Sequence, residues 1–196
     1  MSSIILLGIK HCGKSTQGKM LSKHFSCLFF DTDDEITSLT GKSPREIYIE
    51  SGKEALLEAE KKVCEALSER FSSDAKETPS PEIDSVIATG GGICANPPAL
   101  DALRKIGKFV FLNVDEKTAA NRIIWEIKYD SDGSMKNLPA YIADKNPANI
   151  QDVRLIFHDF YERRQKIYED LCDIEIKFGH NASKSENMRK ILAALT

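Results

Sequence analysis

Short apolar runs alternate along the chain with longer segments in which apolar residues recur at helical spacing. The runs have the length and the apolar content of buried strands, and they cover residues 3–7, 28–30, 85–88, 107–114 and 173–176. The helical pattern covers residues 15–25, 53–71, 97–106, 115–127, 149–171 and 182–195. This alternation predicts a three-layer α/β/α sandwich, in which a five-stranded parallel sheet has helices on both faces.

Two segments interrupt the alternation. Residues 72–84 are rich in Ser, Pro and acidic residues, which is typical of a surface loop. Residues 128–147 lose periodicity around Asp132-Gly133 and Asn146-Pro147. Because long connections in compact domains are usually functional or disordered, residues 128–147 are predicted to form a mobile lid. With no internal repeat, residues 1–196 are predicted to form one domain that contains this lid.

The first apolar run leads directly into a phosphate-binding pattern. Residues Gly8 to Ser15 fit G-x-x-x-x-G-K-[ST] between a predicted strand and a predicted helix. The glycines let successive backbone N–H groups face an anion, while Lys14 adds a mobile ammonium and Ser15 a hydroxyl that suits Mg²⁺. The chain is therefore predicted to bind a nucleoside triphosphate. The nucleotide-binding candidates in this loop are Gly8, Cys12, Gly13, Lys14, Ser15 and Thr16.

Two further motifs follow predicted strands. Asp31-Thr32-Asp33 ends the second run, and Gly90-Gly91-Gly92 follows the third. Ligands of parallel sheets bind beyond the carboxyl ends of the strands, so both motifs are expected to face the phosphate loop. Their chemistry suits a metal, a reacting hydroxyl and a closely approaching ligand. An alternative for the acidic motif is that Asp33 or Asp34 caps the following helix.

Composition narrows the class of protein. The 196 residues carry a net charge of -3, which disfavours nucleic-acid binding. The five cysteines lack a C-x-x-C pair, which is typical of reduced thiols in the cytoplasm and indicates no zinc site. Cys12 is either a reactive thiol or a small side chain that fills the loop. The first apolar run is too short to span a membrane and lacks the features of a signal peptide. We expect a cytoplasmic monomer with a small-molecule substrate and no membrane partner.

The ordered set of motifs resembles the shikimate kinase family, in the nucleoside monophosphate kinase-like branch of P-loop enzymes. The resemblance covers almost the whole chain. It is carried by the following segments: Gly8 to Thr16, Phe30-Asp31-Thr32-Asp33, Thr40-Gly41-Lys42-Ser43, Glu46-Ile47-Tyr48, Gly52 to Glu60, Thr89-Gly90-Gly91-Gly92, Arg122, and Arg164 to Tyr168.

The resemblance implies a P-loop kinase fold and transfer of the γ-phosphoryl group of ATP, with Mg²⁺, to the 3-hydroxyl group of shikimate. It implies that Lys14 contacts the transferred phosphate and that Ser15 and Asp31 hold Mg²⁺. It implies that Asp33 binds the acceptor and serves as the general base. The remaining roles implied by the family are adenine packing by Arg122, acceptor binding by Gly90, Gly91 and Gly92, and carboxylate binding by Arg164.

Two departures from the family pattern stand out. Leu57 occupies the position of a second carboxylate-binding arginine, and Leu138 precedes Pro139 where the lid normally carries an arginine. Lys128 or Lys136 is then either a substitute cation or a solvated loop charge. The departures leave open two alternatives: a kinase of another small polyol or hydroxy acid such as gluconate, and a nucleotide-binding protein with weak or no catalysis.

Overall fold

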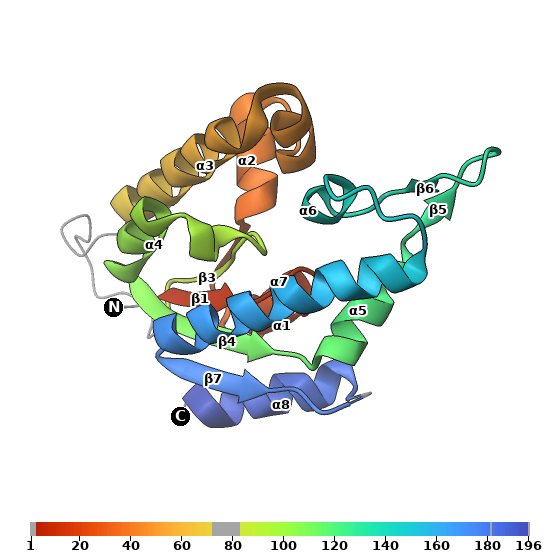
Figure 1. Cartoon of the computed structure of the whole chain (residues 1–196). Helices are drawn as coiled ribbons and strands as arrows, with labels where there is room; N and C mark the ends of the chain where they lie inside the picture. Colours follow the sequence, from red (N-terminus) through yellow and green to blue (C-terminus); the bar gives the residue numbers. More distant parts are fainter. Residues whose placement is uncertain (1–2, 72–82, 181, 196) are drawn as a thin grey trace.

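The fold is a five-stranded sheet with helices on both faces (Figure 1). The computed structural model describes residues 3–71, 83–180 and 182–195. The strands are β1 (Ser3–Leu7), β2 (Leu28–Asp31), β3 (Ser85–Ala88), β4 (Gly107–Asn113) and β7 (Ile174–Lys177). They lie in the order β2-β3-β1-β4-β7, and every pairing between neighbours is parallel. The predicted parallel sheet is confirmed.

The phosphate loop follows the central strand. β1 lies between β3 and β4, with Ile4 opposite both Val86 and Lys108, and all five of its residues are buried. A strand buried on both faces is nearly all apolar, which explains the run Ile4 to Leu7 that follows the buried Ser3. The carboxyl ends of β1, β2 and β3 therefore bring the phosphate loop, the acidic motif and the glycine motif to one edge of the sheet.

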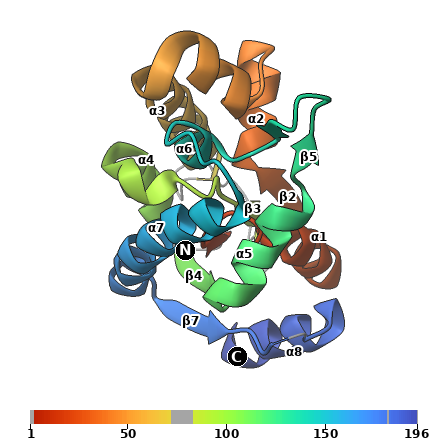
Figure 2. The same ribbon diagram turned by 45° about the vertical axis from the view of Figure 1, so that its right-hand side comes forward.

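Helices cover both faces of the sheet (Figure 2). α1 (Lys14–Phe25) and α8 (Lys184–Leu195) pack together on one face, while α4 (Pro97–Arg104) and α7 (Ile150–Leu171) contact β4 from the other. α3 (Pro44–Phe71) packs on α4, and α5 (Glu116–Trp125) packs on α7. The short helices α2 (Thr32–Thr40) and η2 (Ile93–Ala95) follow β2 and β3. The predicted three-layer sandwich is confirmed.

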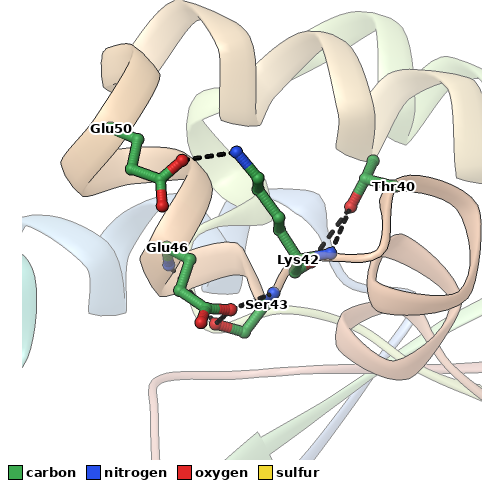
Figure 3. A network of polar contacts seen from close by, with 5 residues as sticks. All are labelled: Thr40, Lys42, Ser43, Glu46 and Glu50. Carbon is green, nitrogen blue, oxygen red and sulfur yellow. Dashed lines mark hydrogen bonds and ion pairs between the residues drawn. The ribbon is translucent and has the colours of Figure 1, made fainter.

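The helix predicted for residues 53–71 begins earlier than expected, at Pro44. Gly52 interrupts it with φ 84° and ψ -179°, a backbone conformation that favours glycine and that divides the apolar pattern. Figure 3 shows how the first segment starts. The Glu46 carboxylate accepts hydrogen bonds from the Ser43 N–H and hydroxyl at 2.7 Å, and the Glu46 N–H donates back to Ser43 Oγ at 3.3 Å. This reciprocal capping box, with Pro44 in the first helical position, stabilises the helix start.

The connection between α2 and α3 is also held by side chains. Gly41 ends α2 in the left-handed conformation, with φ 73°. The Thr40 hydroxyl accepts from the Lys42 N–H at 3.2 Å, and Lys42 Nζ contacts Glu50 at 2.5 Å (Figure 3). The motif from Thr40 to Tyr48 is thus a turn between two helices.

Residues 128–147 are more ordered than the predicted irregular segment. They contain an antiparallel hairpin of β5 (Lys128–Tyr129) and β6 (Met135–Lys136), followed by α6 (Ala140–Ala143). In the hairpin turn Gly133 has φ 81°, and Asp132 accepts from the Ser134 N–H at 2.9 Å. Strands of two residues are too short to produce a periodic signal, which is why the sequence pattern missed them. The hairpin projects from the body of the molecule (Figure 1).

Two expectations remain: the surface loop at residues 72–84 and the lack of a membrane-spanning segment. Most of the loop predicted at 72–84 lies outside the described residues, and residues 83 and 84 are in neither a helix nor a strand. Across the described ranges, no helix is long and apolar enough to cross a membrane.

Candidate active site

The phosphate loop is held in a conformation that its glycines permit. Gly8 has φ 143°, and a Cβ atom there would lie 2.7 Å from Cys12 Sγ and 2.9 Å from the Leu112 carbonyl oxygen. Gly13 has φ 105° at the N-cap of α1. Lys14 is buried, and its ammonium donates to the carbonyl oxygens of Gly8 at 2.7 Å and Ile9 at 2.9 Å. The ammonium therefore lies inside the loop that is predicted to surround the phosphates.

Cys12 fills space in this loop. Its side chain is 1% exposed, and its sulfur lies 3.6 Å from Lys14 Nζ. A thiol needs access to react with an oxidant, so this burial favours the packing alternative. All five cysteines are free.

Ser15 and Asp31 bring two oxygen ligands together at the start of α1. Ser15 Oγ donates to Asp31 Oδ2 at 2.5 Å, and Asp31 Oδ1 accepts from the Asp33 N–H at 3.1 Å. Asp31 is therefore the N-cap of α2, and the alternative that Asp33 or Asp34 caps this helix is wrong. A hydroxyl and a carboxylate beside a phosphate loop fit Mg²⁺, which binds few protein oxygens and keeps the rest of its ligands from water and phosphate. Across the described residues, no group of three or more His, Cys, Asp or Glu side chains that could hold a metal ion is found.

A cavity of about 600 Å³ extends from the phosphate loop and is called the donor cavity here. Thr16, Asp31 and Asp33 line it near the loop, and Arg122 and Trp125 line it on α5. The Arg122 guanidinium donates to the His11 carbonyl oxygen at 2.5 Å, so it is anchored to the loop.

Trp125 was not singled out by the sequence pattern. This residue, the one tryptophan of the chain, lies one helical turn after Arg122. It is 79% exposed, which is unusual for so large an apolar side chain. A large aromatic ring left open at a nucleotide cavity is suited to stacking on a base. The sequence does not show which side of α5 faces the donor cavity, so the place of this ring is known only from the structure.

A second cavity, of about 420 Å³, adjoins the first and is called the acceptor cavity. Lys10, Asp33 and Gly91 line both cavities. The other residues that line the acceptor cavity include Arg45, Tyr48, Lys53, Leu57, Gly92, Leu138, Pro139, Tyr141, Phe160 and Arg164. The donor and acceptor sides therefore meet at Asp33.

Arg164 is fixed on one wall of the acceptor cavity. Its guanidinium donates to the Gly91 carbonyl oxygen and lies 3.7 Å from the centroid of the Phe160 ring. Tyr168 donates to the same carbonyl oxygen at 3.1 Å. A stacked and anchored guanidinium keeps its planar fork oriented, which suits the binding of a carboxylate.

The three glycines have different environments. Gly90 is buried, its N–H donates to Thr32 Oγ1 at 2.8 Å, and it lines neither cavity. A Cβ atom at Gly91 would lie 2.7 Å from the Lys10 backbone nitrogen, and one at Gly92 would lie 3.5 Å from an Arg164 nitrogen. Gly91 and Gly92 thus remain acceptor-site candidates, whereas the Gly90 N–H is already used inside the protein.

Two carboxylates converge on Gly90. A Cβ atom there would lie 3.0 Å from Asp33 Oδ1 and 3.1 Å from Glu60 Oε1. The Asp33 side chain reaches solvent at the cavities. Partial desolvation by the surrounding protein raises the pKa of its carboxyl group, and the Asp31 carboxylate raises it further. Glu60 is 6% exposed and accepts from Asn96 at 2.9 Å, and its burial raises its pKa to about 7. A carboxylate of raised pKa is a stronger base, as proton abstraction from a hydroxyl requires.

Both departures from the family pattern lie on the wall of the acceptor cavity. Leu57 and Leu138 line it, and Leu138 is 5% exposed. On the projecting hairpin, Lys136 Nζ lies 3.2 Å from Asp130 Oδ2 and forms an ion pair with it. Neither Lys136 nor Lys128 lines either cavity. This placement favours the prediction that both lysines are solvated loop charges.

The parallel sheet, the phosphate loop and the two joined cavities are the arrangement of a P-loop kinase. The sequence model of the family described as shikimate kinase matches residues 10–196. The chain belongs to the shikimate kinase family and is therefore a phosphotransferase with an alcohol group as acceptor.

The alignments with similar proteins extend over most of the chain. Shikimate kinase from Blochmanniella floridana is 28% identical over 192 residues, which are 98% of this chain and 91% of that protein. One from Clostridium botulinum is 30% identical over 169 residues, or 86% of this chain and 84% of that protein. The crystal structure of shikimate kinase from Aquifex aeolicus has a TM-score of 0.65 at 29% identity, covering 98% of this chain and 95% of that one. Shikimate kinase from Acinetobacter baumannii in complex with shikimate has a TM-score of 0.71 at 21% identity, covering 100% and 93%, and supports the fold alone.

Proposed function

We propose that this protein transfers the γ-phosphoryl group of ATP to the 3-hydroxyl group of shikimate. The observation that carries the proposal is the junction of the two cavities at Asp33, next to Lys14 on the donor side and in one cavity with Arg164 on the acceptor side. A kinase needs this arrangement because the two substrates must approach each other in line while water is excluded.

On the donor side, the backbone of the loop binds the phosphates and the Lys14 ammonium turns from the loop carbonyls to the transferred group. Arg122 and Trp125 hold the base. Ser15 and Asp31 are proposed to hold Mg²⁺, which neutralises phosphate charge.

On the acceptor side, Arg164 binds the carboxylate and Asp33 accepts the proton of the attacking hydroxyl group. A bond forms between the acceptor oxygen and the γ-phosphorus, the bond from that phosphorus to the bridging oxygen of ADP breaks, and ADP leaves. The raised pKa of Asp33 supports its role as the base.

The segment 128–147 is proposed to act as the lid. Leu138, Pro139 and Tyr141 line the acceptor cavity, and the segment is tied to α3 by two hydrogen bonds. Arg45 donates to Asn137 at 3.1 Å, and Tyr48 donates to Asp144 at 2.7 Å. Opening requires these two contacts to break, and closing them excludes water from the reaction.

The test is shikimate-dependent release of ADP, measured in a coupled assay with the wild-type chain and Asp33→Asn. We expect turnover by the wild type and a loss of about 100-fold or more in kcat for Asp33→Asn, because a positioned base contributes about that much. Asp34→Asn, next to it on α2, is the matched control and should keep wild-type turnover. Undiminished turnover by Asp33→Asn would remove this residue from the mechanism.

Leu57 favours a second candidate acceptor. An apolar side chain on the cavity wall, where the family carries an arginine, suits a less anionic ligand such as another polyol or hydroxy acid. A panel of hydroxylated acceptors that includes gluconate decides between the two, and the larger kcat/KM identifies the substrate.

Because one chain provides the residues that line both cavities, we propose that it acts as a monomer. We also propose that it is a cytoplasmic protein, because its five cysteines are free and thiols stay reduced in the cytoplasm. Light scattering at assay concentrations tests the first of these proposals, and a dimer mass at every concentration would contradict it.

A further inference from the structure

Lys10 occupies a distinctive position in the site. Together with Asp33 and Gly91 it lines both cavities, so it stands where the donor side meets the acceptor side. The family resemblance assigns it no role, and the phosphate-loop pattern leaves its position free.

The backbone of Lys10 is held against the glycine motif. A Cβ atom at Gly91 would lie 2.7 Å from the Lys10 nitrogen, 3.0 Å from its Cα and 3.2 Å from its Cβ. The next residue, His11, turns the chain with φ 65°, and its carbonyl oxygen accepts from Arg122. The root of the Lys10 side chain is therefore fixed, while the rest of it is exposed.

The Lys10 ammonium is also free to act. Among the residues that the structure describes, it has no ion-pair or hydrogen-bond partner. It lines the same two cavities as the Asp33 carboxyl group. A mobile cation beside the reacting groups can approach a phosphate without first breaking another contact.

Among the described residues that line both cavities, Lys10 is the one cation. Leu57 and Leu138 present apolar side chains to the acceptor cavity, and Lys136 is paired with Asp130 on the hairpin. Asp31 and Asp33 both line the donor cavity and carry negative charge. Phosphoryl transfer places further negative charge on the equatorial oxygens, which cationic groups must stabilise.

We propose that Lys10 is a second phosphate-binding lysine, whose ammonium contacts the γ-phosphoryl group as it passes from the donor cavity to the acceptor cavity. This inference rests on the proposed phosphoryl transfer. Lys10 keeps its protons throughout: the proton of the acceptor goes to Asp33, and the electron pair of the broken bond stays on ADP. The charge that Leu138 cannot provide from the lid thus comes from within the phosphate loop.

The test compares Lys10→Met and Lys10→Arg with the wild type. Lys10→Met keeps the length of the side chain and removes its charge, and it should lower kcat by about 10- to 100-fold, as the loss of one group that stabilises the transition state does. KM for the acceptor should change by less than about 3-fold because the contact is made to the transferred group. Lys10→Arg should recover most of kcat. Lys23→Met, at the exposed end of α1, is the matched control and should behave as the wild type.

Two results would overturn the proposal. One is a wild-type kcat in Lys10→Met. The other is an unchanged kcat with a large rise in the acceptor KM, which would make Lys10 an acceptor-binding residue.

A binding experiment separates this proposal from the proposed function. Calorimetric titration with ADP and with a non-hydrolysable ATP analogue needs no acceptor. Lys10→Met should bind the analogue about 10-fold more weakly and ADP as the wild type does. If the wild type phosphorylates no acceptor in the panel, the proposed function fails, and this titration still decides on Lys10. Equal affinities of the wild type and Lys10→Met for the analogue would refute the contact.

Discussion

Glu60 provides a quantitative test of the electrostatics of the site. The residue is 6% exposed, its carboxyl group lies beside Gly90, and Asn96 is the hydrogen-bond donor to it at 2.9 Å. Burial raises its pKa from 4.5 to about 7. The substitution Glu60→Gln keeps the shape and an acceptor for Asn96, and it removes the charge that the folded protein disfavours.

The sign of the effect follows from proton binding. Between pH 4.5 and about 7 the folded state holds the Glu60 proton and the unfolded state has released it, so this group lowers the free energy of unfolding as pH rises. The pKa difference of about 2.5 units corresponds to about 3 kcal/mol, reached at about pH 8. Glutamine does not titrate, so in Glu60→Gln this fall in the free energy of unfolding is absent. Its free energy of unfolding should therefore rise relative to that of the wild type by about 3 kcal/mol between pH 4.5 and pH 8.

Urea unfolding of both proteins at half-unit steps from pH 4.5 to pH 8 measures the difference. Glu58→Gln, on the exposed face of the same helix near Lys61 and Lys62, is the matched control. Exposed ion pairs contribute little, so its difference from the wild type should stay below about 1 kcal/mol at every pH. A change of less than about 1 kcal/mol for Glu60→Gln over this range, or a decrease, would mean that burial does not raise the pKa of Glu60 to about 7.

Three further predictions concern acceptor binding, nucleotide binding and stability. Arg164→Ala should weaken binding of a carboxylate acceptor by about 10- to 150-fold, because one charge-assisted hydrogen bond contributes about 1.5–3 kcal/mol. The affinity for ADP should stay unchanged, and calorimetry measures both affinities. ADP should change the fluorescence of Trp125, the one tryptophan of the chain, and an unchanged spectrum at saturating ADP would contradict its place at the base. Ser43→Ala should lower the free energy of unfolding by about 1 kcal/mol through loss of the capping box, and no loss in a urea titration would contradict that role.

The sequence predicts the sheet and the phosphate-binding edge because both depend on local patterns. A strand buried on both faces is nearly all apolar, and the phosphate loop has fixed positions at Gly8, Gly13, Lys14 and Ser15. Parallel strands bring their carboxyl ends together, so Asp33 could be placed near the loop before its contacts were known. The structure adds that Asp31 caps α2 and that Asp33 lines both cavities. The roles of these two residues toward a metal and an acceptor stay predictions.

Other parts of the site depend on packing that the sequence does not encode locally. The first segment of α3 was missed because Gly52 divides the apolar pattern, although Ser43-Pro44 and Glu46 carry a capping signal. The raised pKa of Glu60 depends on its burial beside Asn96, a residue distant in the sequence. The exposure of Lys10 to both cavities likewise depends on how the loop packs against Gly91.

The two joined cavities are proposed to transfer phosphate from ATP to shikimate although Leu57 and Leu138 stand where the family pattern has arginines. The most direct measurement is ³¹P NMR of the wild-type chain with ATP, Mg²⁺ and shikimate. We expect a new phosphomonoester signal from the 3-hydroxyl group of shikimate, growing in equal amount with ADP. Release of ADP without that phosphomonoester, or no shikimate-dependent reaction in a chain that binds ADP, would contradict it.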